Sequence, residues 1–479
     1  MAAEPNQHQE NEESNLKQSP VVVVMVPFPV QSHLNQLLQL SGIISSYNIP
    51  VHFVTSDIHN RQVKSRFHGS NFNFTKIQFH GFPIPLFPSL PPNHDPITKF
   101  PLHLMPSFEA SMQLQQHVAD LLNSLSPTAK RLVVVHDGLM ASVVQDFSSI
   151  ANAEAYAFHS NSAFNSLSYV CDAMGKDVQL GEGIFSSKLP SLVSSFPTEV
   201  AIFMGSQFEL LRAQVSGELF NTCRLIEGKF LDLLARVDVN GKNKLWAVGP
   251  LHEVTNSFKP RERDGKDKCL DWLENQEENS VLFISFGTTT TMSCQQIEEL
   301  AIGLEQSGIK FIWVLRDADR GDVFKEDQNK SDQLLFPLGF EERVRAKGMV
   351  VRDWVPQLEI LGHPSTGGFM THCGWNSCME SISMGVPLAT WPMHSDQPRN
   401  GVHITEVLKV GLSVGKWERR DDLVTSSMIK EAVKRLMASK EGEEMRKRCE
   451  ELGEEMRKSI DQGGVTRKEW DSFVAHINR

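Results

Sequence analysis

A strand–helix–strand pattern opens this chain, and the same pattern returns in its second half. Residues 21–26 (VVVVMV) form a continuous apolar run, which is typical of a parallel strand buried on both faces. Leucine and isoleucine at helical spacing follow over 34–44, and 51–55 (VHFVT) indicates the next strand. Strand, helix and strand in this order predict a doubly wound α/β sheet.

A second series of the same kind begins at 281–286 (VLFISF). A helix over 297–305 and strands over 311–315, 349–351 and 367–371 follow it. The charged stretch before this series is typical of a linker between domains. The predicted organisation is a disordered polar tail (1–20), an N-terminal domain (21–250), a linker (251–277), a C-terminal domain (278–455) and a final helical segment (456–479).

Ligands of open α/β sheets bind at the carboxyl ends of the strands, so two such domains predict a cleft between them. Neither half carries Gly-x-Gly-x-x-Gly after a strand, nor a Gly-x-x-x-x-Gly-Lys-Ser/Thr loop. Their absence counts against a nicotinamide-dependent oxidoreductase and a P-loop nucleotidase. The Pro- and Phe-rich stretch 79–108 favours an irregular loop that lines a pocket.

Charge and cysteine usage narrow the functional classes further. The 479 residues carry 47 Lys and Arg against 58 Asp and Glu, and no basic stripe is visible, so nucleic-acid binding has little support. The seven cysteines include no Cys-x-x-Cys pair, which favours a reducing compartment over a zinc site or disulfides. The first twenty residues lack the pattern of a signal peptide, and the run 21–26 is too short to span a membrane. We expect a cytoplasmic protein with no integral membrane segment and no metal, and a monomer because no coiled-coil pattern is visible.

The segment 354–397 contains a predicted anion site. Residues 374–377 open a helix there, with small residues such as Gly374 at its start, and the free N–H groups of a helix N-terminus favour an anion. His372 stands just before that helix, where it can donate a hydrogen bond to a phosphate oxygen.

Other side chains of the same segment suit a nucleoside and a sugar. Trp354 offers a flat face to a base, and Glu380, one turn beyond Asn376, can accept hydrogen bonds from both hydroxyls of a ribose. Asp396 and Gln397 supply adjacent acceptors and donors for sugar hydroxyls. Together these residues predict a site for a nucleoside diphosphate sugar.

Residues 354–397 resemble, over their full length and without a gap, the signature segment of plant family 1 UDP-glycosyltransferases. The resemblance extends along nearly the whole chain towards the zeatin O-glucosyltransferases of that family, carried by 100–111 (FPLHLMPSFEAS), 139–146 (LMASVVQD) and 391–400 (WPMHSDQPRN). It implies a GT-B architecture, with two Rossmann-like domains facing a cleft. It also implies an acceptor-binding N-terminal domain, a UDP-sugar-binding C-terminal domain and a final helix that packs back on the first domain. UDP-glucose would be the co-substrate, with no further cofactor.

The resemblance implies a role for each residue of the donor site. The uracil and ribose would be held by Trp354, the Val355 backbone, Gln357 and Glu380. The diphosphate would be held by Thr288, His372, Asn376 and Ser377. The sugar would be held by Trp375, Asp396 and Gln397, with Trp375 acting alternatively through its backbone while its ring packs. Ser395 is predicted on the donor side as well, although it or His394 could instead contact the acceptor.

Transfer to an alcohol needs a base, because a neutral hydroxyl is a poor nucleophile. His33 follows the first strand, and an imidazole titrates near neutral pH, so it suits this role. Asp137 ends another strand of the same domain and can orient the imidazole and stabilise its charged form. The family pattern places its catalytic His and Asp at these two positions. Attack opposite UDP would give a β-glucoside from an α-linked donor, with the helix N-terminus and His372 stabilising the departing diphosphate without a metal.

One residue departs from the family pattern. Ser32 stands where the family usually has Gly just before the catalytic His. If this position requires a positive φ, serine costs roughly 1 kcal/mol of strain. Otherwise the serine would alter the access of the acceptor without excluding catalysis.

Several functional alternatives remain beside a glucosyltransferase that acts on a zeatin-type cytokinin. The acceptor could be a flavonoid, a terpenoid or another specialised metabolite, because acceptor pockets lie in variable loops. The donor could be UDP-xylose, since the terminal Gln of the segment accompanies glucose with exceptions. A catalytically silent nucleotide-sugar binder is a further alternative, against which the intact His33 and Asp137 argue.

Overall fold

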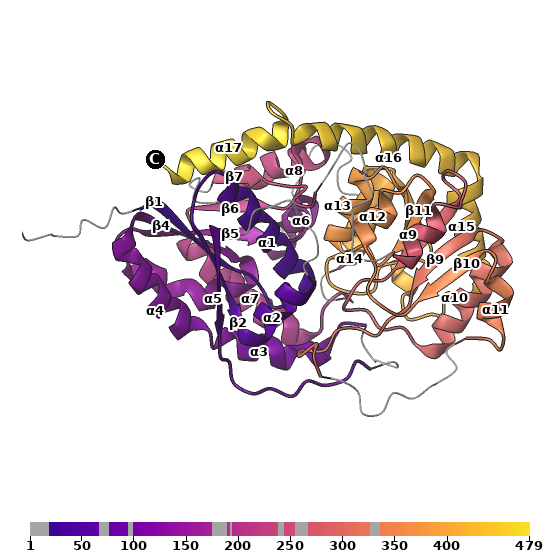
Figure 1. Cartoon of the computed structure of the whole chain (residues 1–479), viewed down its shortest axis with the longest axis horizontal. Helices are drawn as coiled ribbons and strands as arrows, with labels where there is room; N and C mark the ends of the chain where they lie inside the picture. Colours follow the sequence, from indigo (N-terminus) through magenta and orange to yellow (C-terminus); the bar gives the residue numbers. More distant parts are fainter. Residues whose placement is uncertain are drawn as a thin grey trace, which may run out of the picture.

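The computed structural model describes residues 19–66, 76–93, 99–174, 189–191, 194–237, 244–253, 267–325 and 336–479. Within these ranges the chain forms two α/β lobes side by side, and the last helices run along one edge of both (Figure 1). Most of the predicted tail, residues 1–18, and residues 254–266 of the predicted linker lie outside the described residues.

The N-terminal lobe is built on a parallel sheet with the strand order β3-β2-β1-β4-β5-β6-β7. Its strands are β1 (Ser19–Val26), β2 (Val51–Ser56), β3 (Ile77–Phe82), β4 (Ala129–Asp137), β5 (Ala153–His159), β6 (Gly217–Phe220) and β7 (Lys244–Ala247). Its helices are α1 (Gln31–Ser46), α2 (Asp57–Arg66), α3 (Met105–Met112), α4 (Gln115–Leu125), α5 (Ala141–Val144), α6 (Ala163–Met174), α7 (Thr198–Gln214) and α8 (Arg224–Val237).

The C-terminal lobe repeats this plan with the parallel strand order β10-β9-β8-β11-β12-β13. Its strands are β8 (Val281–Ser285), β9 (Lys310–Val314), β10 (Gly348–Val351), β11 (Thr366–Thr371), β12 (Leu388–Thr390) and β13 (Gly411–Ser413). The helices of this half are α9 (Lys268–Leu273), α10 (Cys294–Ser307), α11 (Phe340–Val344), α12 (Gln357–Leu361), α13 (Trp375–Ser383), α14 (Gln397–Val402), α15 (Ser426–Ala438), α16 (Lys440–Ser459) and α17 (Val465–Ile477).

Both sheets are doubly wound because their central strands are apolar on both faces. Along β1, Val21, Val23 and Met25 belong to one core cluster, whereas Val22, Val24 and Val26 belong to another. The first cluster includes residues of α1 and the second includes residues of α4, so each face of the sheet is covered by helices. This arrangement explains the uninterrupted apolar run, since every position from Val21 to Val26 is buried.

The strand order of each sheet reverses at one point, and doubly wound sheets bind ligands at such a switch point. In the N-terminal lobe the reversal lies between β1 and β4, and in the C-terminal lobe between β8 and β11. The segment that follows β1 carries His33, and β4 ends at Asp137. The segments that follow β8 and β11 carry Thr288 and His372. The topology therefore brings the predicted base and the predicted diphosphate contacts to the switch points of their sheets.

Helix α17 belongs to the C-terminal end of the chain but packs into the N-terminal lobe. Phe473, Val474 and Ile477 lie in the same core cluster as β1 and α1. The Phe473 ring stands edge-on to Tyr156 and Trp246, with ring centroids 5.4 and 5.2 Å away. The preceding helix α16 crosses residue 455, the boundary predicted from the sequence.

We expect Phe473→Ala to lower the free energy of unfolding by about 3–5 kcal/mol, because it empties a fully buried aromatic site. The loss is measured as a shift of the denaturation transition followed by tryptophan fluorescence. Ile202→Ala, at an exposed site, is the control and should change stability by less than about 0.5 kcal/mol. An equal response of the two variants would contradict the packing role of α17.

The sequence predictions need correction in two stretches. The irregular loop predicted over 79–108 is wrong at both ends, where β3 and α3 are regular. Pro106 is tolerated there because it lies in the first turn of α3, where its missing N–H has no intrahelical partner. Part of the predicted linker is also helical, since Asp267 accepts hydrogen bonds from Cys269 N and Leu270 N and thereby caps α9.

Candidate active site between the two lobes

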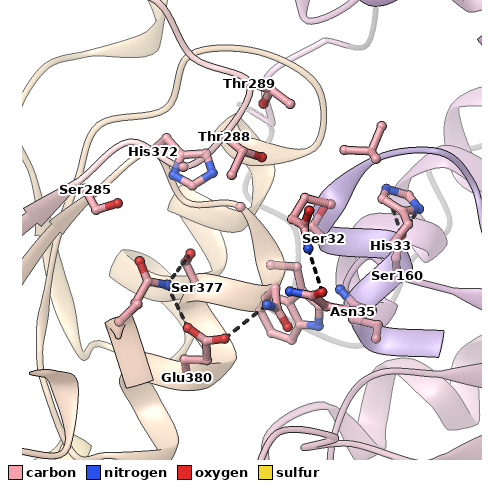
Figure 2. Close-up of a pocket in the computed structure, with 18 of the residues that line it drawn as sticks. Ser32, His33, Asn35, Ser160, Ser285, Thr288, Thr289, His372, Ser377 and Glu380 are labelled. Atoms are coloured by element: carbon pink, nitrogen blue, oxygen red, sulfur yellow. Dashed lines mark hydrogen bonds between the residues drawn. The ribbon is translucent and has the colours of Figure 1, made fainter. Parts of the chain in front are cut away.

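A cavity of about 1600 Å³ lies between the lobes and is lined by both of them. Figure 2 shows side chains from both lobes converging on it, with His33 and Ser160 on one side and His372, Ser377 and Glu380 on the other. Its walls include every site residue that the sequence predicted: His33, Asp137, Thr288, Trp354, Val355, Gln357, His372, Trp375, Asn376, Ser377, Glu380, Ser395, Asp396 and Gln397.

The partly exposed His33 and the buried Asp137 form a pair on the N-terminal wall of the cavity. Nδ1 of His33 lies 2.7 Å from Oδ2 of Asp137, and the second carboxylate oxygen accepts a hydrogen bond from Leu139 N. The carboxylate is therefore held on both sides, and it fixes the orientation of the imidazole. With Nδ1 engaged by Asp137, the neutral ring presents Nε2 as a proton acceptor.

The charge state of His33 is set by opposing effects. Burial lowers the pKa of His33, but the charge and hydrogen bond of Asp137, with a contribution from Asp396, outweigh it and raise the pKa above the ordinary 6.5. A raised pKa makes the imidazole a stronger base than a free histidine, which suits removal of a proton from a hydroxyl.

The opposite wall carries the N-terminus of α13, where the chain turns tightly around His372. A Cβ on Gly287 or Gly374 would lie 2.6 Å from Nε2 of His372, so only glycine allows these two loops to approach the ring. Burial lowers the pKa of His372 to about 4, which keeps the imidazole neutral at physiological pH. The N–H groups at the start of α13 therefore supply the positive potential for an anion without a charged histidine.

Glu380 is the centre of a small hydrogen-bond network beside this helix start (Figure 2). Gln357 Nε2 donates to Oε2 of Glu380 over 2.7 Å and lies 3.1 Å from Oγ of Ser377. Asn376 Nδ2 donates to Oε1 over 3.1 Å. Burial raises the pKa of Glu380 to about 7, against the effect of these two donors. The network holds both carboxylate oxygens in place beside the cavity, where they can accept from vicinal hydroxyls.

The indole of Trp354 provides an exposed flat surface in the same cavity, with 44% of the residue accessible. Such a surface is suited to stacking with a nucleobase. Val355, the next residue, is buried and also lines the cavity.

The side chain of Trp375 is not placed to hold the sugar, which is one of the two roles predicted for this residue. Its indole N–H donates to the backbone oxygen of Asn221 over 2.7 Å, and its ring stacks on His403. The ring is therefore engaged in packing between the lobes and has no free donor for a sugar hydroxyl. Its backbone N–H, in the first turn of α13, is the group that remains for a donor contact.

The segment from Met393 to Gln397 forms a tight loop stabilised by its own hydrogen bonds. Oε1 of Gln397 accepts from the backbone N–H groups of Met393 and His394, and Ser395 adopts a φ of 61°. The Ser395 N–H donates to the backbone oxygen of Ser195 in the other lobe. Burial raises the pKa of Asp396, whose carboxylate accepts from Asn400 Nδ2 over 2.8 Å. The loop thus fixes the Asp396 carboxylate in the cavity wall.

Two family descriptions match the chain, one for each lobe. Residues 19–253 match "Glycosyltransferase, N-terminal domain", and residues 256–446 match "UDP-glucoronosyl and UDP-glucosyl transferase". A zeatin O-glucosyltransferase of Phaseolus lunatus is 50% identical over 475 residues, which cover 98% of this chain and 99% of that protein. A zeatin O-xylosyltransferase of Phaseolus vulgaris is 50% identical over 465 residues, which cover 96% and 98%.

This chain belongs to the plant family 1 UDP-glycosyltransferases. The crystal structure of a UDP-glycosyltransferase from Siraitia grosvenorii in complex with UDP superposes with a TM-score of 0.73 at 27% identity, covering 96% of this chain and 100% of that one. The predictions of the family, of the GT-B architecture and of a UDP-glycosyltransferase activity are therefore confirmed.

The condition under which Ser32 would be strained is not met in this UDP-glycosyltransferase. Ser32 lies in the first turn of α1 and is not among the residues with positive φ. The helix begins at Gln31, so serine adopts ordinary helical backbone angles there.

Two contacts of the UDP-glycosyltransferase site escaped the sequence analysis. Ser160 follows β5, and its Oγ lies 3.0 Å from Nδ1 and 3.3 Å from Nε2 of His33 (Figure 2). Arg66, at the end of α2, reaches across the cavity to the C-terminal lobe. Ser160 directly follows a strand, which would have marked it as a candidate for the site. The sequence analysis did not predict this strand, β5.

Among the described residues, no helix of this UDP-glycosyltransferase combines the length and apolarity needed to cross a membrane. In the same ranges, no group of three or more His, Cys, Asp or Glu side chains is placed to bind a metal ion.

We expect Glu380→Ala to raise the Kd of UDP about 10- to 100-fold, because hydrogen bonds to a charged group contribute about 1.5–3 kcal/mol. Isothermal titration with UDP measures this change. Glu451→Ala, on the exposed face of α16, serves as the control. An unchanged Kd in Glu380→Ala would show that Glu380 does not contribute to binding of the nucleotide.

Proposed function

We propose that this UDP-glycosyltransferase is an inverting UDP-glucose-dependent O-glucosyltransferase. Its leading acceptor is the side-chain hydroxyl of a zeatin-type cytokinin. The observation that carries the proposal is the pair His33 and Asp137, 2.7 Å apart, in the same cavity as the N-terminus of α13. The N-terminal lobe would bind the acceptor and the C-terminal lobe the UDP-sugar.

The reaction follows from the placement of these groups. Nε2 of His33 takes the proton of the acceptor hydroxyl as its oxygen attacks the anomeric carbon. The bond between that carbon and the diphosphate oxygen breaks, and UDP leaves towards the N-terminus of α13 and His372. Attack from the face opposite UDP inverts the anomeric centre, so an α-linked donor gives a β-glucoside. Asp137 stabilises the imidazolium that forms on His33.

The acceptor side of the cavity is apolar and aromatic. The Phe28 ring lies 5.4 Å from the His33 ring and 4.6 Å from the Phe108 ring, and Phe203 lies on the same wall. Aromatic walls favour a flat acceptor through stacking. A cytokinin of the zeatin type has a flat purine and a short chain that ends in a hydroxyl, which fits a hydroxyl placed at His33. The two relatives at 50% identity carry zeatin in their names, which supports the same acceptor class.

A xylose donor is the second candidate, because one of these relatives is a xylosyltransferase at the same identity. The aromatic wall would also accept a flavonoid or a terpenoid. We further propose that the protein is cytoplasmic, since none of its seven cysteines, all of which the structure describes, forms a disulfide. We also propose that it is a monomer.

The test is UDP release by the purified protein with trans-zeatin and either UDP-glucose or UDP-xylose, with mass analysis of the product. Transfer of a hexose to zeatin would support the proposal. Transfer of a pentose would instead indicate that the donor is UDP-xylose. Release with flavonoids or terpenoids but not with zeatin would refute the cytokinin acceptor. UDP binding without turnover on a broad acceptor panel would indicate a silent nucleotide-sugar binder.

A further inference from the structure

Arg66 links the two lobes across the cavity through a two-point ion pair. It is the last residue of α2 in the N-terminal lobe, whereas Asp319 follows β9 in the C-terminal lobe. Nη1 of Arg66 lies 2.5 Å from Oδ2 of Asp319, and Nη2 lies 3.0 Å from Oδ1. The two side chains are 16% and 8% exposed. A planar guanidinium bound in this bidentate way fixes both distance and orientation between its neighbours.

On the N-terminal side, Arg66 is tied to the helix that carries the base. Its Nη1 also donates to Oε1 of Gln31 over 3.0 Å. Gln31 is the first residue of α1, two positions before His33, and it is almost fully buried. The same Oε1 accepts from Nε2 of Gln62, so the start of α1 is held firmly against α2.

On the C-terminal side, Asp319 is tied to the donor half of the cavity. Its backbone N–H donates to the backbone oxygen of Thr288 over 2.7 Å. Its Oδ1 also accepts from Nη2 of Arg316, and the guanidinium carbons of Arg66 and Arg316 lie 5.0 and 5.3 Å from the ring centroid of Trp354. Arg66 thus contacts both the indole platform and the loop beside Thr288.

We propose that Arg66 is a positioning residue for sugar transfer, acting with Asp319 as a clasp that sets the distance between His33 and the donor. This inference rests on the proposed transfer reaction. The base lies on one lobe and the predicted diphosphate contacts on the other, so the alignment of the reacting atoms depends on how the lobes are held together. A misplacement of about 1 Å can reduce a rate about 100-fold. The clasp joins the first turn of α1 to the Thr288 loop and therefore acts on that alignment directly.

A positioning role of Arg66 can be distinguished from a direct contact with the nucleotide, because a direct contact would change the Kd of UDP as well as kcat. Arg66→Gln removes the ion pair but leaves Asp319 paired with Arg316, so the variant retains a partner for the buried carboxylate. We expect kcat to fall about 10- to 100-fold, while the Kd of UDP changes less than about threefold. The acid limb of the pH profile should not move, since Asp137 remains beside His33.

Asp319→Asn should lower kcat at least as much, because it removes the charge that pairs with both Arg66 and Arg316. Adding Arg66→Gln to Asp319→Asn should lower kcat little further, because the ion pair between Arg66 and Asp319 is already broken. Arg343→Gln, which breaks an exposed ion pair with Glu305 inside the C-terminal lobe, is the control and should leave kcat unchanged. An unchanged kcat in Arg66→Gln would overturn the proposal. So would a loss of UDP affinity that accounts for the whole effect, which would make Arg66 a nucleotide contact.

A measurement without an acceptor separates this proposal from the proposed function. Spin labels on Cys294 in the C-terminal lobe and on Asp120→Cys in the N-terminal lobe, both exposed, report the distance between the lobes. A Cys171→Ser background removes the other accessible thiol. With UDP bound, we expect one narrow distance in the parent chain and a broader or shifted one in Arg66→Gln. If the parent chain transfers no sugar at all, the proposed function fails. An unchanged distance distribution in Arg66→Gln would then still refute the clasp.

Discussion

His33→Ala should lower kcat for sugar transfer by about 10²–10⁴-fold and leave the Kd of UDP unchanged. The imidazole stands on the N-terminal wall beside Asp137, whereas the predicted nucleotide contacts lie on the opposite lobe. Without it, the acceptor hydroxyl must lose its proton to water as it attacks.

The comparison is made at saturating donor, with transfer followed by product mass and UDP binding by calorimetry. His117→Ala is the matched control, because this histidine stacks on Phe82 away from the cavity lining. Full activity in His33→Ala would show that another group removes the proton. A parallel loss of UDP binding would mean that His33 supports the donor site.

Asp137→Asn should also lower kcat strongly, by about 10²–10⁴-fold, because the neutral amide no longer stabilises the imidazolium. The side chain keeps its shape, and its remaining oxygen can accept the hydrogen bond of Leu139 N that the carboxylate accepts now. The loss therefore reflects charge and tautomer rather than a collapsed turn.

The pH profile gives the Asp137 prediction a second and independent readout. The base works only when His33 is neutral, so kcat/KM rises with pH through the raised pKa of His33, and the acid limb lies above pH 6.5. In Asp137→Asn the charge that raises the pKa is gone while burial, which lowers it, remains. The acid limb should consequently move to lower pH in the variant. If the acid limb does not move in Asp137→Asn, this limb does not report the titration of His33 beside Asp137.

The donor half of the site could be predicted because its residues are close in the sequence. His372, Asn376 and Glu380 lie on one strand end and the first turns of the helix that follows it, so the spacing alone fixes their common face. The same holds for the start of the sheet, where the valine run of β1 marks a strand buried on both faces. Such patterns can be recognised in the sequence because all of their residues belong to one strand, or to one strand and the helix that follows it.

Other features had no local pattern from which they could be predicted. Arg66 and Asp319 are 253 positions apart, and Ser160 is 127 positions from His33, so only the folded chain brings them together. The short strands β12 and β13 have three residues each, too few for a periodicity to appear. Of the two roles predicted for Trp375, the one in which its side chain holds the sugar did not anticipate that the backbone oxygen of Asn221, from the other lobe, would accept from its indole N–H.

The position of α17 has a consequence for folding during synthesis of the protein. The N-terminal lobe lacks Phe473 and Ile477 of its core until α17 has left the ribosome. At about 5–20 residues per second, some ten to forty-five seconds separate the synthesis of β7 from that of α17. During that interval Tyr156 and Trp246 lack the aromatic neighbour that covers them in the finished chain. The N-terminal lobe can thus complete its core only after α17 has been synthesised, although its own sheet is made first.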